Sequence, residues 1–173
     1  PRHIAKRGSG LEINYRALHG EKNNFRNLDI IYFNKDDEFK KETSNSDSSR
    51  WIYKFNDILN LNHSTINIDW SKSSDGLVLR DIPGDITSIG YRRIQNLNQN
   101  ISFQTRFKNT KLTIEHQSYQ SLNPILTNGY KKSPALNLKY RKNINGFILS
   151  EDLDISTFKA NTIHGYFGYQ TMD

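Results

Sequence analysis

The sequence contains no cysteine, one methionine and four prolines. Without cysteine the chain can form neither a disulfide nor a thiolate metal site. No run of about 18 apolar residues occurs, which excludes a transmembrane helix. A starting methionine and a hydrophobic signal-peptide core are also missing, because the chain opens on Pro1. We therefore expect an excerpt from a longer protein.

Sequence motifs of catalysis are missing as well. The five histidines are scattered, without the HExxH spacing or another pairing that suits a metal. The sequence holds no glycine-rich phosphate loop, GxSxG motif or nucleophile triad. We expect no enzymatic activity, no metal site and no cofactor in these residues.

The balance of charge and hydropathy limits the class of protein. Of the 173 residues, 35% are hydrophobic, and mean hydropathy is -0.76. A transmembrane β-barrel remains open at this hydropathy, since only every second residue of its strands must be apolar. The net charge of +6 permits nucleic acid, anionic lipid or a phosphorylated glycolipid as partner. Ordinary surface charge is the alternative unless the basic residues share a face.

The clearest pattern in the chain runs from Ile101 to Gln117. Apolar and polar residues alternate strictly on both sides of a break at Asn109-Thr110. Successive side chains of a strand point to opposite faces, so this period of two predicts strands with one apolar and one polar face. A two-residue break containing asparagine is typical of a tight hairpin turn.

Similar patterning predicts strands elsewhere in the chain. The ranges are 1–7, 11–17, 25–33, 51–56, 66–70, 136–141 and 147–158, with weaker candidates at 89–94 and 164–169. Gly8-Ser9-Gly10 predicts a turn. The apolar run at 30–33 is too continuous for its faces to be assigned, and we predict no helix.

The connections between these strands alternate in length. Short connections lie around Gly20, Asn60, Asn109 and Asn145, and long ones at 34–49, 72–98 and 121–134. In a meander, alternate connections lie at opposite ends of the sheet, and outer-membrane barrels carry short turns at one end and long loops at the other. We therefore predict an all-β, antiparallel up-and-down meander that is a partial segment of a large transmembrane outer-membrane β-barrel.

Aromatic residues support this interpretation. Trp51, Trp70 and Tyr140 lie near predicted strand ends, as in the aromatic girdles of membrane barrels. A soluble antiparallel sheet packed on a second layer would show the same alternation and is the alternative fold.

Several stretches, read in order, are similar to the motifs of one family. PRHIAKRG and NYRAL resemble a proline-led strand and basic-Gly turn before an "EFRYL"-like strand, and IIYFNKDDEF resembles "YLPxDKxF". DSSRWIYKF resembles an Arg-Trp strand after an acidic loop, and INIDWSKSSDGLVLRDI resembles "FNxDYxxVSDxxYFxDF". Tyr119 to Leu122 and YKKSPALNLKY resemble "FQ(T/V)L…PYxxxPQLxL". These collinear matches cover roughly residues 1 to 158 and resemble the barrel of LptD, the lipopolysaccharide-assembly family of Gram-negative outer membranes.

The resemblance implies that residues 1–173 are the N-terminal part of a partial β-barrel domain, without the family's first barrel strand, periplasmic jelly-roll domain or disulfide cysteines. The implied location is the outer membrane, among its lipids. The implied partners are lipopolysaccharide, an LptE-like lipoprotein plug, and a periplasmic LptA-like bridge through the missing jelly-roll. Pro1 would lie beside the lateral gate, where a residue that cannot donate to the ladder weakens strand pairing. A proline that merely starts a strand is the alternative.

Four basic residues are predicted to lie opposite the apolar stripes, and hence to line the lumen of a barrel. They are Lys54, Arg106, Lys139 and Arg141. Our hypothesis is that they guide the phosphate-bearing head group of lipopolysaccharide, which is inserted into the outer leaflet without bond chemistry. A generic polar lumen contacting water and the plug is the alternative for each residue.

A rival function is a soluble all-β binding module for an acidic glycan or nucleic acid. We expect no nucleic acid, because the aromatic residues share the apolar stripes and are not interleaved with the basic ones for base stacking.

Overall fold

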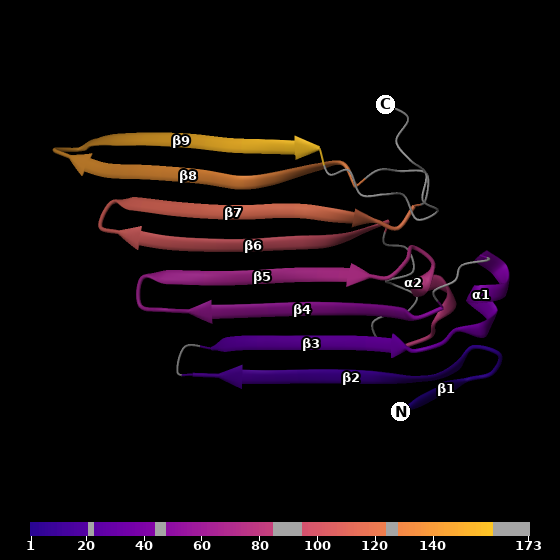
Figure 1. Ribbon diagram of the computed structural model, residues 1–173. Coiled ribbons are helices and arrows are strands. Elements are labelled where there is room, and N and C mark those ends of the chain that lie inside the picture. The colour runs from indigo at the N-terminus through magenta and orange to yellow at the C-terminus, as the bar shows by residue number, and fades with distance from the viewer. Residues whose placement is uncertain (21–22, 44–47, 85–94, 124–127, 161–173) are drawn as a thin grey trace.

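The computed structural model describes residues 1–20, 23–43, 48–84, 95–123 and 128–160. They form one nine-stranded antiparallel sheet whose strands are paired in chain order, with β1 and β9 at opposite edges of an open sheet (Figure 1). The strands are β1 Arg2–Ile4, β2 Gly8–His19, β3 Asn24–Phe33, β4 Arg50–Asn60, β5 Ser64–Ser73, β6 Asn96–Phe107, β7 Thr110–Ser121, β8 Tyr130–Ile144 and β9 Phe147–Ala160. The predicted all-β antiparallel meander is confirmed.

The connections are arranged as their lengths predicted. Short turns join β2 to β3, β4 to β5, β6 to β7 and β8 to β9 at one end of the sheet, which we call the turn end (Figure 1). The long connections leave from the other end, which we call the loop end. Asn145 and Gly146 both have positive φ, the requirement of a two-residue type I′ hairpin turn.

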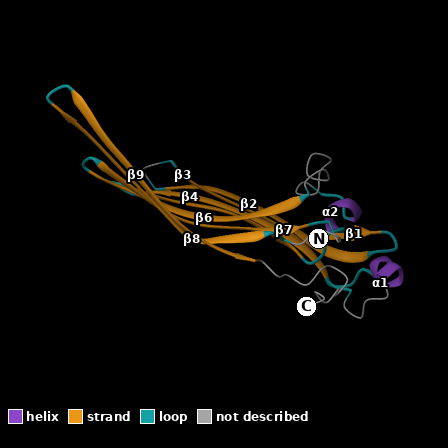
Figure 2. Cartoon of the chain, turned by 90° about the horizontal axis from the view of Figure 1, so that it is seen from above, coloured by secondary structure: helices purple, strands orange, loops and turns teal. Residues whose placement is uncertain are grey.

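Two helices lie at the loop end, where none was predicted. They are α1 Asp37–Thr43 and α2 Val78–Asp81 (Figure 2). Asp36 caps α1, because its Oδ1 accepts a hydrogen bond of 3.0 Å from the backbone N–H of Phe39. Helices of seven and four residues are too short to display a helical period, so the prediction of no helix was wrong.

Strand boundaries also differ from the predictions. Gly8-Ser9-Gly10 belongs to β2 and pairs with β1, and the turn lies before it, with Lys6 at φ 67. The hairpin turn between β6 and β7 is at Lys108-Asn109, since Phe107 and Thr110 are paired. Backbone pairing between neighbouring strands thus covers more residues than the alternation of side chains predicted. The candidate strands at 89–94 and 164–169 lie outside the described residues.

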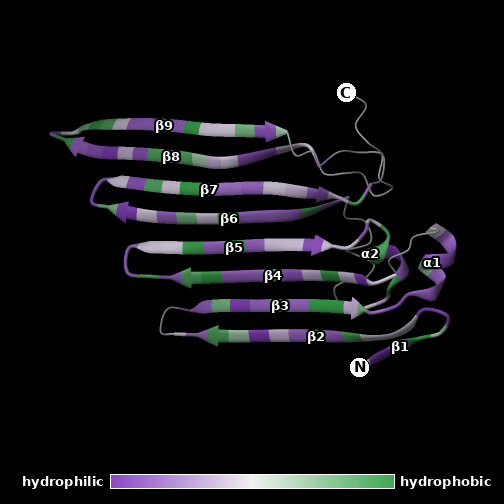
Figure 3. Ribbon diagram, in the orientation of Figure 1, coloured by the Kyte–Doolittle hydropathy of each residue, from purple (hydrophilic) through white to green (hydrophobic). Residues whose placement is uncertain are grey.

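Strand register separates the side chains into two faces. Ile66, Phe103, Ile114, Leu136 and Ile155 lie opposite one another in one row across five strands. We call the side of the sheet that carries this row the apolar face. Hydrophobic and hydrophilic residues alternate along the strands in Figure 3, as the sequence predicted.

The other side, which we call the polar face, carries the row Asn67, Ser102 and Glu115. At the loop end this face is instead apolar, because Ile31 of β3 and Ile52 of β4 are buried there as a cross-strand pair. This explains the continuous run at 30–33, in which the residues on both faces are apolar.

The main hydrophobic cluster lies where α2 meets these strands. It consists of Ile31, Phe33, Ile52, Val78, Leu79, Ile82, Leu97 and Leu122. Since Ile31, Phe33 and Ile52 point to the polar face, the α2 segment packs on that side of the sheet. The described part of the β5–β6 connection, up to Gly84, therefore packs against the polar face of β3 and β4.

The apolar face has no comparable cover. Apart from the strands, the described elements are two short helices, and the sheet forms a single twisted layer (Figure 2). Ile101 and Ile114 are each 40% exposed and Ile155 is 57% exposed. The predicted alternative of a sheet packed on a second layer is thus not seen in the described residues. Neither described helix could cross a bilayer.

We expect Ile82→Ala to lower the free energy of unfolding by about 2–5 kcal/mol, because Ile82 is fully buried in the cluster. Denaturant unfolding in detergent micelles measures the loss, and limited proteolysis should show faster cleavage around α2. Ile155→Ala removes the same atoms from an exposed site and is the matched control. Equal effects of the two substitutions would contradict this packing.

Candidate functional site: the polar face of the sheet

The four basic residues predicted to line a lumen all lie on the polar face by strand register. Arg106 and Lys139 belong to one row, joined through Lys111 between them. Lys54 lies on β4 and is separated from this row, and Arg141 lies two residues beyond Lys139 along β8. The structure therefore brings two of the predicted residues together and adds Lys111, which the prediction had left out.

At the loop end, Arg50 forms a buried ion-pair cluster. Its side chain is 0% exposed and binds Asp75 through two parallel contacts, Nε–Oδ2 at 2.9 Å and Nη2–Oδ1 at 2.7 Å. Nη1 donates to Oδ2 of Asp36 and to Oδ2 of Asp81, both at 3.1 Å. One guanidinium thus joins the start of β4 to both neighbouring long connections.

Two further cations balance the charge of this cluster. Arg7 Nη1 donates to Asp36 Oδ2 at 2.8 Å, and Arg80 Nε donates to Asp81 Oδ1 at 2.8 Å. Three arginines therefore face three aspartates. We call Arg7, Asp36, Arg50, Asp75, Arg80 and Asp81 the Arg50 cluster. Because removing charges from water is costly, burial of Arg50 depends on this pairing.

An aromatic ring closes the Arg50 cluster on one side. The guanidinium carbon of Arg50 lies 4.2 Å from the ring centroid of Phe39 on α1, within cation–π range. The contact couples α1 to the sheet, since Arg50 begins β4. It also excludes water from the ion pairs, which strengthens them.

The protonation of Asp36 depends on this environment. Burial alone would raise the pKa of its carboxyl, but the backbone N–H of Phe39 and the guanidinium groups of Arg7 and Arg50 outweigh burial. They hold the pKa of Asp36 below its ordinary value of 3.8. Asp36 is therefore charged throughout the neutral range and stabilises the cluster there.

Midway along the polar face, carboxylates accept hydrogen bonds from asparagines. Asp69 receives the amides of Asn56 and Asn98, each at 2.7 Å, and Asp29 receives that of Asn27 at 2.7 Å. Three other side-chain oxygens of this zone are buried without a hydrogen-bond donor in the described residues: Asn27 Oδ1, Asp29 Oδ1 and Asn98 Oδ1. Buried acceptors need partners, so this zone suits a hydrated surface.

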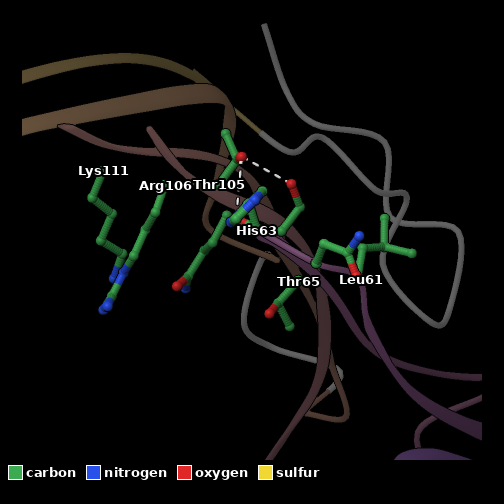
Figure 4. A pocket seen from close by; sticks show the side chains of 9 residues that line it. Leu61, His63, Thr65, Thr105, Arg106 and Lys111 are labelled. Atoms are coloured by element: carbon green, nitrogen blue, oxygen red, sulfur yellow. Dashed lines mark hydrogen bonds between the residues drawn. The ribbon is translucent and has the colours of Figure 1, made fainter. Parts of the chain in front are cut away.

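At the turn end, the polar face carries a pocket of about 300 Å³ (Figure 4). Its lining includes His63, Thr65, Thr105, Arg106 and Lys111. The two basic side chains extend side by side in the same direction. Thr65 and the two cations thus share the polar face by strand register, whereas Thr105 belongs to the apolar face.

The remaining predicted features are placed as follows. Pro1 is exposed and precedes β1, which pairs with β2 through three residue pairs. His116, one of the five scattered histidines, stacks on Trp70 on the apolar face, with ring centroids 5.8 Å apart. Within the described ranges, no group of three or more His, Asp or Glu residues is placed to hold a metal ion.

Sequence reasoning missed the Arg50 cluster. Its three aspartates lie in the long connections, which show no periodicity. Two features of the sequence could have pointed to it. An arginine is the first residue of the otherwise aromatic strand β4, and acidic residues lie in the long connections before β4 and after β5. Alone they do not reveal pairing, which depends on how the connections fold.

No protein-family model matches the chain, and no curated protein shows significant similarity to it.

We expect Arg50→Met to destabilise the protein by about 3–5 kcal/mol, because it leaves buried aspartates without their shared cation. Denaturant unfolding in micelles measures the change. Arg16→Met, an identical substitution at an exposed residue of the same face, should change stability by less than about 0.5 kcal/mol. A loss in both variants, or in neither, would show that Arg50 does not hold the loop end.

We expect acidic pH to destabilise the loop end, because Asp36 becomes protonated. Because the folded-state pKa of this carboxyl is lowered, its contribution is present above the ordinary value of 3.8 and is lost as pH falls through the lowered value. We expect proteolysis around α1 to accelerate below about pH 3.8 with an acid-stable protease. Asp36→Asn should be cleaved faster at neutral pH and show a smaller acid-induced change. A pH profile identical in the two proteins would contradict the assignment.

Proposed function

We propose that this chain is a segment of an outer-membrane β-barrel belonging to an LptD-like translocon, which inserts lipopolysaccharide into the outer leaflet. One observation carries the membrane part of the proposal. Large side chains of the apolar face, such as Ile114 and Ile155, are exposed, while the described α2 segment packs against Ile31 and Ile52 of the opposite, polar face. A soluble sheet would cover its apolar face first.

Acyl chains are the solvent that suits such a face. In hydrocarbon every backbone polar group needs a partner, and strands meet this need only in a closed barrel. Nearly all of β9 is exposed, and β2 pairs with β1 over only three of its twelve residues. Such bare edges call for further strands on both sides. The sheet therefore fits an arc of a larger barrel.

Polar residues border the apolar face at both ends. At the turn end Arg26 and Asp57 form an ion pair on this face, with Nη2–Oδ2 at 2.6 Å, and at the loop end Lys72 lies on it. Trp51 and Trp70 lie toward the same loop-end border. An apolar band with charged and aromatic borders matches a bilayer with its head-group levels.

The identity of the cargo rests on the motif resemblance, which the Arg50 cluster supports. Arg50 is the arginine of the Arg-Trp match, and Asp75 and Asp81 are the two aspartates of the "SD" and "DF" matches. These residues, quoted from separate motifs, meet in one buried ion-pair cluster. The motif positions are therefore explained by one shared structural role.

In this proposal the polar face surrounds a hydrated path for lipopolysaccharide. Lys54, Arg106, Lys139 and Arg141 line it, an LptE-like plug contacts it, and an LptA-like bridge delivers the cargo through a jelly-roll domain. Pro1 lies beside the lateral gate, at an edge where β1 forms only a short ladder.

Single cysteines test the membrane part, since the chain has none of its own. Phe103→Cys and Gln104→Cys place a thiol at adjacent positions on opposite faces. In reconstituted vesicles, a bimane label at 103 should be quenched by brominated acyl chains, while a thiol at 104 should react with a water-soluble maleimide. Phe103→Cys protected from lipid and water alike would indicate a dry interior and reject the barrel.

Photo-crosslinking in cells tests the cargo. A photoreactive residue at 104 should capture lipopolysaccharide, and one at 103 should capture mainly phospholipid. Membrane insertion without a lipopolysaccharide adduct at 104 would indicate a barrel for another cargo. Recovery of the protein in the aqueous fraction without detergent would favour the soluble module for an acidic glycan or nucleic acid.

A further inference from the structure

We propose that Arg106 and Lys111, with Lys139 beside them, form a binding site for phosphate groups at the turn end of the polar face. The three residues lie directly opposite one another on β6, β7 and β8. We call them the basic row. The inference assigns a defined ligand site to this row rather than a general positive charge to the face.

Uncompensated charge is the first argument for a ligand. Like charges directly opposite on neighbouring strands destabilise a sheet. Lys139 has a counter-ion, since its Nζ lies 3.0 Å from Asp152 Oδ2. Among the described residues, no carboxylate lies within ion-pair distance of Arg106 or Lys111. A bound anion would relieve the repulsion between them.

The pocket geometry is the second argument. Neighbouring strands lie about 4.8 Å apart, so adjacent members of the basic row can contact one phosphate together. Figure 4 shows the Arg106 and Lys111 side chains running in parallel beside the pocket. Arginine offers a planar fork for two phosphate oxygens and lysine adds a compact charge. The pocket of about 300 Å³ has room for a phosphate group.

A hydrogen bond between β5 and β6 holds the strands together at this pocket. Ser64 and Thr105 lie in the pocket wall and are hydrogen-bonded to each other at 2.8 Å between Oγ and Oγ1. Thr105 also donates to the backbone oxygen of His63 at 3.3 Å. Ser64 and Thr105 belong to the face of Ile66 and Phe103, so these bonds join β5 to β6 behind the basic side chains and hold the strand that carries Arg106 in place.

The charge pattern of the polar face confines an anion to this end. Midway along the face, Asp69 and Glu115 hold negative charge, and asparagine amides already occupy an oxygen of each carboxylate. A phosphate would be repelled from that zone and attracted to the basic row. On the polar face, the turn end is therefore the end that would bind an anion.

The carrier of the phosphate follows from the proposed function, on which this step rests. Short turns of outer-membrane barrels face the periplasm, so the basic row would lie at the mouth where cargo enters. We infer that it takes the phosphorylated head group of a glycolipid during entry. Its charge would orient the head group toward the polar face.

The test compares Arg106→Glu/Lys111→Glu with Lys142→Glu, which makes the same type of charge change at the turn end but lies in an apolar-face row opposite Leu149. Binding of inorganic pyrophosphate and of a diphosphorylated glycolipid in mixed micelles is measured by calorimetry. We expect the double variant to lose about hundredfold or more in affinity for both probes, as removal of charge-assisted contacts implies. The control should stay within about twofold.

Further outcomes separate the two proposals. Unchanged binding in the double variant would overturn the site, even if the labels at 103 and 104 support the barrel. Equal affinity for phosphorylated and dephosphorylated glycolipid would show that the phosphate of the head group is not recognised. This result would overturn the head-group assignment and leave free phosphate as ligand. Arg106→Gln/Lys111→Gln, which removes charge without reversing it, should weaken binding with the native fold retained. Wild-type affinity in this variant would also reject the site.

Discussion

The loop end of this protein is organised by one constraint, the burial of the Arg50 guanidinium. A charge removed from water is tolerated only when its donors are satisfied and its charge is balanced. Asp36 and Asp81 come from the connections on either side of β4–β5, and Asp75 supplies a two-point contact. The position of both connections over the sheet follows from this requirement. Once they are held there, the α2 segment covers the apolar patch of β3 and β4 on the polar face.

The two faces of the sheet consequently have opposite relations to their surroundings. On the polar face, charges are paired at the loop end, and carboxylates and amides are linked midway; at the turn end, Arg106 and Lys111 have no carboxylate at ion-pair distance among the described residues. On the other face, large apolar side chains are exposed in a single layer. An apolar face left bare in a single layer favours contact with apolar surroundings, which is the basis of the proposed function. In the proposed function, membrane and cargo would contact opposite sides of the same strands.

Much of this fold could be read from the sequence, because the period-two pattern depends only on the alternation of side chains along a strand. It separated Phe103 from Gln104, placed Lys54 and Arg106 on one face, and predicted which connections would be short. What it missed depends on tertiary contacts. Helix α1 is stabilised by Asp36 and by the contact of Phe39 with Arg50, neither of which appears as periodicity.

The grouping of Arg106 and Lys139 with Lys111 into one row was missed for a related reason. Its members are separated in sequence, and their opposition is a property of strand register rather than of local pattern. The sequence predicted a turn at Gly8 and Gly10, because glycine locally favours turns. Their pairing with β1 overrides that preference.

The Arg50 cluster also has a consequence for the order in which the protein assembles. Each hairpin at the turn end closes between neighbours in sequence, whereas Arg50 meets Asp75 and Asp81 across 25 and 31 residues. Contacts across longer separations cost more chain entropy and form later. Until the β5–β6 connection is synthesised and folded back, the β3–β4 hairpin carries an arginine with only part of its counter-charge. Assembly should thus proceed from the hairpin tips, and the opposite rim should become rigid last.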